Sequence, residues 1–168
     1  MADFGEIARL KREEFERVSR DERQRLENEQ KAREAIVLNR VDIIERLVRP
    51  LLKKAMEQCA LEHIELRFLD QFDVANYSVP RRPSIKVWGA SPPRIGDGYQ
   101  SESPPIFIEA DEGKIYVGYG QNSFESSPRS ALDVADIGSH EGLLEKAIEH
   151  LLQDYFEHLR SVPWVLRS

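Results

Sequence analysis

The sequence contains very little cysteine and no hydrophobic run long enough to cross a membrane. Cys59 is the single cysteine among 168 residues, so no disulfide can form within the chain. No apolar run approaches the roughly 18 residues that a membrane-spanning helix needs. The first residues also lack the basic segment followed by an apolar one that defines a signal peptide. We therefore expect a cytoplasmic protein without a membrane-spanning segment.

An excess of basic charge is also missing. The formal net charge is -6, and residues 61–168 hold 17 acidic and 10 basic side chains. Residues 1–60 are nearly balanced, with 14 basic and 13 acidic side chains. Because a domain that binds a nucleic-acid duplex normally presents a basic surface, we do not expect nucleic acid as the main partner.

Sequence motifs of common catalytic sites are absent. We find no phosphate-binding loop, no nucleophile elbow and no paired Cys-x-x-Cys. At 168 residues and 40% hydrophobic composition, the chain is nevertheless long enough to bury a core without disulfides or metals. These features favour a protein that needs no cofactor and is not an enzyme.

Proline and glycine are missing from residues 7–34, where most residues are strong helix formers. Opposite charges recur four residues apart in this segment, with the acidic residue first: Glu13/Arg17, Glu16/Arg20, Asp21/Arg25, Glu27/Lys31 and Glu29/Arg33. Each such pair stabilises a helix by about 0.2–0.5 kcal/mol. We therefore expect residues 1–35 to form a long charged helical arm.

A few apolar residues follow a regular spacing along this arm. Phe4, Phe15 and Leu26 are eleven residues apart, and Ile7 and Val18 lie beside the first two. Eleven residues make about three helical turns, so these side chains form one narrow stripe. Such a stripe can pair with a second copy, lie across the protein's own body, or stay solvated. We expect pairing into a homo-oligomer, of coiled-coil type or otherwise, although heptads are not sustained.

Residues 36–168 have the pattern of a compact α+β domain. Residues 36–61 are amphipathic and predict a helix that packs on a core. Pro50 falls inside this helix, and an interior proline kinks or restarts a helix. We therefore expect a kink at Pro50, with the arm either continuous with this helix or separated from it by a break near residues 37–39.

Four segments then alternate apolar and polar residues as strands do, at residues 63–69, 84–90, 106–110 and 114–119. The last two are joined by a short turn that contains Gly113. Ser139 is a suitable N-cap for a final helix, whose wide apolar face predicts contact with more than one element. The predicted fold is α+β, with a four-stranded, mainly antiparallel sheet and the C-terminal helix packed on one sheet face.

Strand periodicity predicts a second sheet face that carries aromatic side chains. If the aliphatic residues of the strands face the helices, the opposite face holds Trp88, Phe107 and Tyr116, with Lys86, Arg67, Glu65 and Glu109 around them. Aromatic residues supply many of the energetic centres of interfaces, so this face is a candidate partner-binding surface. Alternatively, the arm, loops or tail cover these residues, or they stabilise the sheet as cross-strand pairs.

Three residues four apart on the final helix, His150, Asp154 and His158, form the one weak candidate for a metal site. Two imidazoles and a carboxylate are suitable zinc ligands or proton-transfer groups. The spacing is not that of zinc proteases, and no further histidine cluster or cysteine supports it. Histidines that pair with a neighbouring carboxylate at a helix boundary are the simpler interpretation, and we expect no metal.

Together these features predict a protein–protein interaction module, such as an adaptor, scaffold or chaperone-like protein. It would self-associate through the arm and bind a protein partner through the aromatic sheet face. One alternative is an acidic inhibitor or immunity-type protein that blocks a basic target by electrostatic complementarity. A further alternative is a metal-dependent hydrolase that uses the His150 group.

Overall fold

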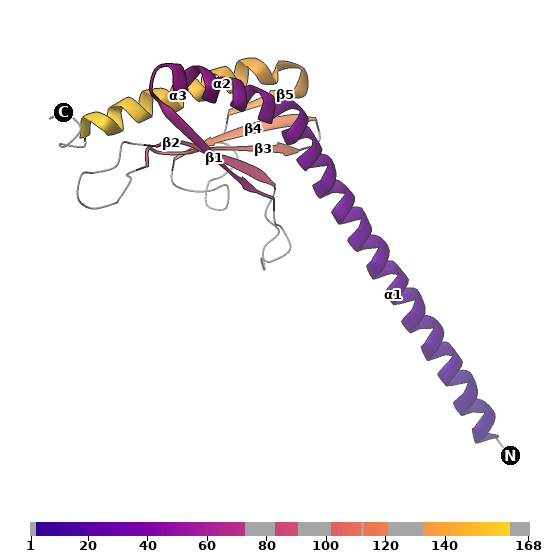
Figure 1. Ribbon diagram of the computed structural model, residues 1–168. Coiled ribbons are helices and arrows are strands. Elements are labelled where there is room, and N and C mark those ends of the chain that lie inside the picture. The colour runs from indigo at the N-terminus through magenta and orange to yellow at the C-terminus, as the bar shows by residue number, and fades with distance from the viewer. Residues whose placement is uncertain (1–2, 73–82, 91–101, 112, 121–132, 162–168) are drawn as a thin grey trace. The chain divides into compact units, whose positions relative to one another are not determined.

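The computed structural model describes the chain over residues 3–72, 83–90, 102–111, 113–120 and 133–161 (Figure 1). The chain divides into two compact units, Met1–Leu38 and Asn39–Ser168. The first unit is helical, and the second combines helices with an antiparallel sheet. The predicted α+β class is therefore confirmed.

The first unit is formed by helix α1, Phe4–Ile43, whose last residues, 39–43, belong to the second unit. Asp3 stands directly before the helix, and its Oδ1 accepts hydrogen bonds from the backbone N–H groups of Gly5 (2.9 Å) and Glu6 (3.3 Å). A side-chain oxygen at this position satisfies N–H groups of the first turn that have no partner within the helix. The helix thus begins where the sequence supplies a cap.

Ion pairs along α1 join side chains three or four residues apart. They are Arg9–Glu13 (3.2 Å), Lys11–Glu14 (2.9 Å), Arg12–Glu16 (3.0 Å) and Arg25–Glu29 (3.6 Å). In each pair the basic residue comes first, whereas the sequence predicts the opposite order. Glu13 and Glu16 have a basic residue four positions away on either side, and each pairs with the preceding one. All these side chains are exposed, so water and salt screen each pair and its contribution to stability is small.

A π-helical turn, η1, Ile44–Val48, separates α1 from helix α2, Arg49–Leu61. The N–H group of the first residue of α2 donates to the carbonyl oxygen five residues earlier. Proline has no N–H to donate, and the wider turn places Pro50 at the start of α2, where no such donor is needed. The irregularity expected at Pro50 therefore takes the form of this π-helical turn. There is no break at residues 37–39, because α1 continues through them.

The sheet contains five strands in the described part of the chain: β1 Glu65–Gln71, β2 Ser84–Ala90, β3 Ile106–Asp111, β4 Lys114–Tyr119 and β5 Asp133–Asp136. Each strand pairs antiparallel with the next along the chain, so the spatial order equals the sequence order. The prediction of four strands is wrong. Strand β5 is short, and two of its four residues are aspartates, which are depleted in strands, so its pattern is weak.

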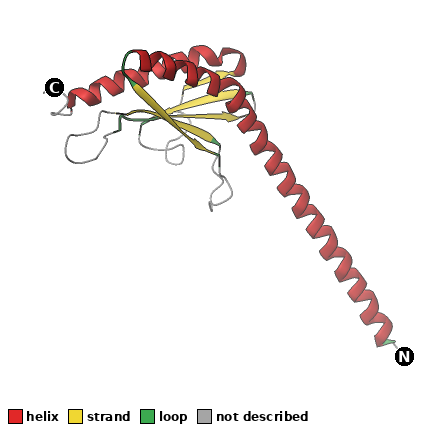
Figure 2. Ribbon diagram, viewed as in Figure 1, coloured by secondary structure: helices red, strands yellow, loops and turns green. Residues whose placement is uncertain are grey.

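The helices of the second unit form a layer on one face of the sheet (Figure 2). Helix α3, His140–Ser161, follows a short 3-10 turn, η3, Ile137–Ser139, and packs on the sheet beside α2. The buried side chains between the two layers include Ile44, Val48, Leu52, Leu66, Ile85, Val87, Ile108, Ile115, Val117, Leu144, Ala147 and Leu151. The predicted packing of the C-terminal helix on one sheet face is therefore confirmed. The apolar residues 162–166, which the sequence predicts to pack back onto the body, lie outside the described residues.

A glycine in β2 determines how closely α3 approaches the sheet. A Cβ atom at Gly89 would lie 2.4 Å from Cδ2 of Tyr155, so no other residue fits there without a shift of the ring. Ser103 holds the backbone at this point: its Oγ accepts a hydrogen bond from the N–H of Gly89 (3.0 Å), and its own N–H donates to the Gly89 carbonyl (3.2 Å). Because residue 89 has no side chain, the ring of Tyr155 packs directly against the backbone of β2.

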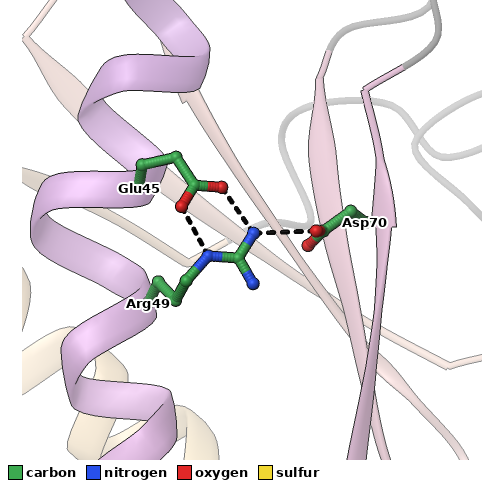
Figure 3. A network of polar contacts seen from close by, with 3 residues as sticks. All are labelled: Glu45, Arg49 and Asp70. Carbon is green, nitrogen blue, oxygen red and sulfur yellow. Dashed lines mark hydrogen bonds and ion pairs between the residues drawn. The ribbon is translucent and has the colours of Figure 1, made fainter.

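Arg49 fastens the start of α2 to β1 (Figure 3). Its guanidinium donates to Glu45, one turn earlier, with an Nε–Oε2 distance of 2.6 Å, and to Asp70 Oδ2 of β1 at 2.8 Å. It also lies 5.1 Å from the ring centroid of Phe68, in cation–π geometry. The hydrogen bond to Glu45, followed by that to Asp70, raises the pKa of Arg49, so the residue stays charged. The π-helical turn beside Pro50 is thereby held against the sheet.

Candidate interaction surfaces

The sheet face opposite the helices carries the aromatic residues predicted to bind a partner. Strand register places Arg67 across from Trp88, and Lys86 across from Phe107. Tyr116 in β4 lies across from Glu109, which follows Phe107 by two positions in β3. Directly opposed residues in antiparallel strands share one sheet face, and so do residues two apart in one strand. One surface, here called the aromatic face, is therefore formed by Arg67, Lys86, Trp88, Phe107 and Tyr116.

The aromatic face is only partly open. Phe107 and its neighbour Glu109 are each 4% exposed, whereas Arg67, Trp88 and Tyr116 are half-buried. Phe107 is therefore buried and does not itself present a surface. The accessible portion of the face consists of the two remaining rings with the basic side chains beside them.

Trp88 combines a cation–π contact with an unsatisfied donor. Lys86 Nζ lies 4.8 Å from the centroid of the indole ring, and 3.5 Å from Oε2 of Glu102. The indole Nε1 is shielded from solvent and has no hydrogen-bond partner. Buried donors of this kind are uncommon in native proteins and cost free energy. In the described part of the aromatic face, Trp88 is thus the side chain that is least satisfied within the chain.

The second surface is the apolar stripe predicted along the arm. Its members are exposed to different extents: Phe4 76%, Phe15 71%, Val18 53%, Leu26 53% and Ile7 47%. We call these five residues the arm stripe. Large apolar side chains that are exposed singly are normal, but an ordered row of them is typical of an interaction site.

A third surface, which the sequence analysis did not identify, is a groove between α2 and α3. Its volume is about 340 Å³. Its lining residues are Leu51, Leu52, Lys54, Ala55, Gln58, Glu141, Leu144, Glu145, Ile148, Glu149 and Leu152. The wide apolar face of the final helix was the sequence signal for it, because a helix that touches two elements leaves a seam between them. We call this surface the α2–α3 groove.

The candidate metal residues come together only in part. His150 Nε2 lies 3.4 Å from Asp154 Oδ2 on α3, and its ring meets Tyr119 edge-on at 4.5 Å between centroids. Over the described residues, no three histidine, cysteine or acidic side chains are placed to hold a metal ion. His158 therefore does not complete a three-ligand group with His150 and Asp154. The pair matches the simpler interpretation of a histidine beside a helix carboxylate.

A polar cluster beside His150 joins three elements of the fold. The hydroxyl of Tyr119 in β4 donates to Asp133 Oδ2 in β5 (2.8 Å), and Lys146 Nζ of α3 lies 3.4 Å from the same oxygen. The hydrogen bond from Tyr119, and then the nearby Lys146, hold the pKa of Asp133 below its usual value. Burial, and then the Asp133 carboxylate, raise the pKa of Tyr119, which stays a neutral donor. The cluster ties the short strand β5 to the fold.

Cys59 does not form a reactive site. It is buried on α2, where it belongs to the hydrophobic core. Burial raises the pKa of its thiol, so the protonated form dominates at neutral pH. A thiol in this state is a poor nucleophile and behaves as a small apolar side chain.

No protein-family model, curated protein or solved structure matches this chain. Within the residues that the structure describes, no helix is both long enough and apolar enough to cross a membrane. Function is therefore inferred from the three surfaces themselves: the aromatic face, the arm stripe and the α2–α3 groove.

Proposed function

We propose that this chain is a non-enzymatic protein–protein interaction module of the cytoplasm. It self-associates through its N-terminal arm and binds a protein partner through the aromatic face. The observation that carries the proposal is the arm stripe, a row of large apolar side chains, each about half exposed or more, on a helix held by exposed ion pairs.

A comparison of the free energy of apolar burial with the cost of association favours an associated arm over a solvated one. Full burial of one large apolar side chain contributes about 1.5–3 kcal/mol. Association of two chains costs about 4–15 kcal/mol in lost freedom of motion. Two copies that bury their arm stripes against each other bury ten such side chains. The summed free energy of burial is then large enough to offset the cost of association. The Arg9–Glu13 and Arg12–Glu16 pairs need not break, because they lie away from the stripe and remain in water.

Light scattering after size exclusion tests the role of the arm. We expect residues 1–168 to form a dimer or larger oligomer. We expect residues 36–168 to form a folded monomer whose circular dichroism spectrum still shows the β-sheet. Phe15→Glu in the full chain should reproduce the effect of the deletion, because it places a charge in the stripe. Arg20→Glu, on the opposite side of the helix, is the matched control. An unchanged oligomer mass for the deletion would refute self-association through the arm.

The aromatic face supports the second half of the proposal. Trp88 and Tyr116 are half-buried beside Lys86 and Arg67, so apolar rings lie within a charged frame. Such a combination is typical of the centre of an interface, where tryptophan, tyrosine and arginine contribute most.

The double variant Trp88→Ala with Tyr116→Ala separates a binding role from a structural one. We expect the variant to lose proteins that the wild-type chain captures from a lysate of its native cells, while its melting temperature falls by only a few degrees. Leu61→Ala, at a side chain that is 79% exposed and far from these strands in sequence, is the control. A large drop in melting temperature would instead show that the two rings belong to the core.

A further inference from the structure

The α2–α3 groove lies between two helices of the second unit, and its middle is apolar. Leu52 and Leu144 lie in the buried core beneath it and offer no surface to another molecule. The apolar residues that remain half-buried in its lining are Leu51 and Ala55 of α2, and Ile148 and Leu152 of α3. These four residues, here called the apolar strip, are the surface that a partner can cover.

Ala55 leaves a hollow in the apolar strip. It has the smallest side chain of the lining, and it lies between the longer side chains of Leu51 and Gln58 along α2. The volume of the groove, about 340 Å³, is larger than a single apolar side chain. A large apolar side chain of another molecule can therefore enter at Ala55 and be buried there, as anchor residues are in the pockets of interfaces.

The α3 rim of the groove is a row of three glutamates, Glu141, Glu145 and Glu149, spaced four residues apart. All three are exposed, and none forms an ion pair with a residue that the structure describes. Lys146, which follows Glu145 directly, pairs instead with Asp133 of β5 (3.4 Å). Like charges at this spacing destabilise a helix. The negative charge of this glutamate row therefore does not stabilise α3 and is available to a partner.

The other rim of the groove carries less charge. Its polar residues on α2 are Lys54 and Gln58. The lining as a whole thus holds three acidic side chains and one basic side chain, and the acidic ones all lie along α3. A ligand that covers the apolar strip gains most in electrostatic complementarity from basic groups on the flank that faces α3.

The length and spacing of the α3 rim suit a helix as the ligand. The lining runs from Glu141 to Leu152, which is about 16 Å, or three helical turns, at a rise of about 1.5 Å per residue. Side chains four residues apart on a helix are about 6 Å apart. Basic residues at this spacing on a facing helix therefore meet successive glutamates. Binding of an amphipathic helix by its apolar face is a common use of apolar grooves.

From these observations we infer that the α2–α3 groove binds an amphipathic, basic helix of a partner protein. The apolar row of that helix lies on the apolar strip, with one large side chain in the hollow at Ala55. Basic side chains four residues apart on one flank of the row pair with the glutamate row. The arm of a second copy lacks this pattern, because Lys11 and Glu22 lie in the middle of its apolar stripe. This site goes beyond the proposed function, since it needs neither the arm stripe nor the aromatic face.

A synthetic helix tests the chemistry of the groove. The probe is a fluorescein-labelled peptide of about 18 residues, or five helical turns, with a row of leucines and with lysines four residues apart along one flank of that row. The matched control peptide has the same composition, but its lysines lie on the face opposite the leucines. We expect saturable binding of the probe to the full chain by fluorescence anisotropy, about tenfold tighter than binding of the control. Equal binding of both peptides would overturn the proposed site, because net charge alone would then explain it.

Filling the hollow tests the apolar contact. Ala55→Leu in the full chain occupies the space that the probe needs, and we expect the dissociation constant of the probe to rise about tenfold or more. Ala60→Leu makes the same substitution in α2 at an exposed position outside the groove and should leave the dissociation constant unchanged. Both variants should keep the circular dichroism spectrum of the wild type. Wild-type affinity of Ala55→Leu for the probe would overturn the proposed site.

Removal of charge tests the glutamate row separately. Glu145→Gln with Glu149→Gln keeps the shape of both side chains, and we expect the dissociation constant of the probe to rise about three- to tenfold at low ionic strength. The difference from wild type should shrink in high salt, because salt screens exposed charges. Glu62→Gln with Glu157→Gln makes the same change of net charge outside the groove and is the control. An equal effect of both double variants would contradict a specific role for the row.

Further measurements distinguish the possible occupants and separate this site from the proposed function. A labelled peptide of residues 1–35 that binds more tightly than the basic probe would show that the arm of a second copy is the occupant, and would overturn the assignment to a partner. The variants Phe15→Glu and Trp88→Ala with Tyr116→Ala should bind the basic probe as the wild type does. A failure of the arm or of the aromatic face in its own test therefore leaves the result for the groove unaffected, and the reverse also holds.

Discussion

The two units of this chain use apolar residues in opposite ways. In the second unit, side chains such as Ile44, Val87 and Leu151 are fully buried between helices and sheet. In the first unit, Phe4 and Phe15 are more than 70% exposed on a helix that is stabilised by its cap and by ion pairs along its surface. Local interactions are therefore sufficient to describe the arm as a helix, whereas the body depends on contacts between segments far apart in the sequence.

This difference separates two roles for similar residues. An apolar side chain in the body contributes to the free energy of unfolding, because folding removes it from water. An apolar side chain in the arm contributes little to folding, and its burial is left for association. Variants in the two units should consequently change different measurements.

The largest expected effect is the loss of a core side chain in the body. Leu151→Ala, at a residue with no exposed surface, should reduce the free energy of unfolding by about 2–5 kcal/mol in urea denaturation. Leu26→Ala, in the arm, should change it by less than about 0.5 kcal/mol, as expected for a surface substitution. Equal losses for both variants, measured at a concentration where the chain is monomeric, would remove the distinction between the units.

Packing in the body gives an intermediate effect. Gly89→Ala should destabilise the fold by about 1–3 kcal/mol, because the added methyl group would overlap the ring of Tyr155. Gly142→Ala is the matched control within α3, since nothing lies near its added methyl group. It should instead stabilise the helix by up to about 1 kcal/mol through the higher helix propensity of alanine. Thermal unfolding by calorimetry measures both changes.

The smallest effect concerns the polar cluster that ties β5 to the body. Tyr119→Phe removes the hydrogen bond to Asp133 and should cost about 0.5–1.5 kcal/mol at neutral pH. In the wild type this bond lowers the pKa of Asp133, so its stabilisation is present above the unfolded pKa of about 4. It is lost as the pH falls through the lower folded value. The difference between variant and wild type should therefore shrink on acidification, in denaturation experiments from pH 7 to pH 3.

An exposed ion pair of the arm is the control for the pH dependence expected of Tyr119→Phe. Lys11 lowers the pKa of Glu14, first through a hydrogen bond, but both groups are in water and screened by salt. Lys11→Gln should leave the unfolding free energy of the body unchanged at every pH. A pH-dependent loss of the same size as for Tyr119→Phe would mean that the arm contributes to folding of the body.

All four predicted strands form, and two of them have the predicted bounds; β1 begins two residues later, at Glu65, since His63 has a φ of +60°. The β2 and β4 ranges match the predicted segments, because Ile85 and Val87, like Ile115 and Val117, alternate with polar or aromatic residues. The turn glycine is also as predicted, since Gly113 has a φ of +83°. Strand β5 was missed, because four residues with two aspartates carry too little pattern. Its pairing with β4 and the hydrogen bond from Tyr119 hold it in place.

The candidate surfaces were predicted to different degrees. The members of the arm stripe follow from helical spacing alone, and those of the aromatic face follow from strand alternation. The burial of Phe107 does not follow from alternation, because it depends on what surrounds the ring in three dimensions. The α2–α3 groove and the Asp133 cluster were not predicted, since their residues come from elements distant in sequence.

The sequence by itself determined the helical arm, the alternating strands and the faces on which their side chains lie, because these depend on periods of about 3.6 and 2 residues and on local capping. Only the tertiary structure decided the π-helical turn before Pro50, the fifth strand, the close approach of Tyr155 to Gly89 and the groove between α2 and α3. The physical reason is that each of these requires packing between segments whose separation in sequence carries no information about their distance in space.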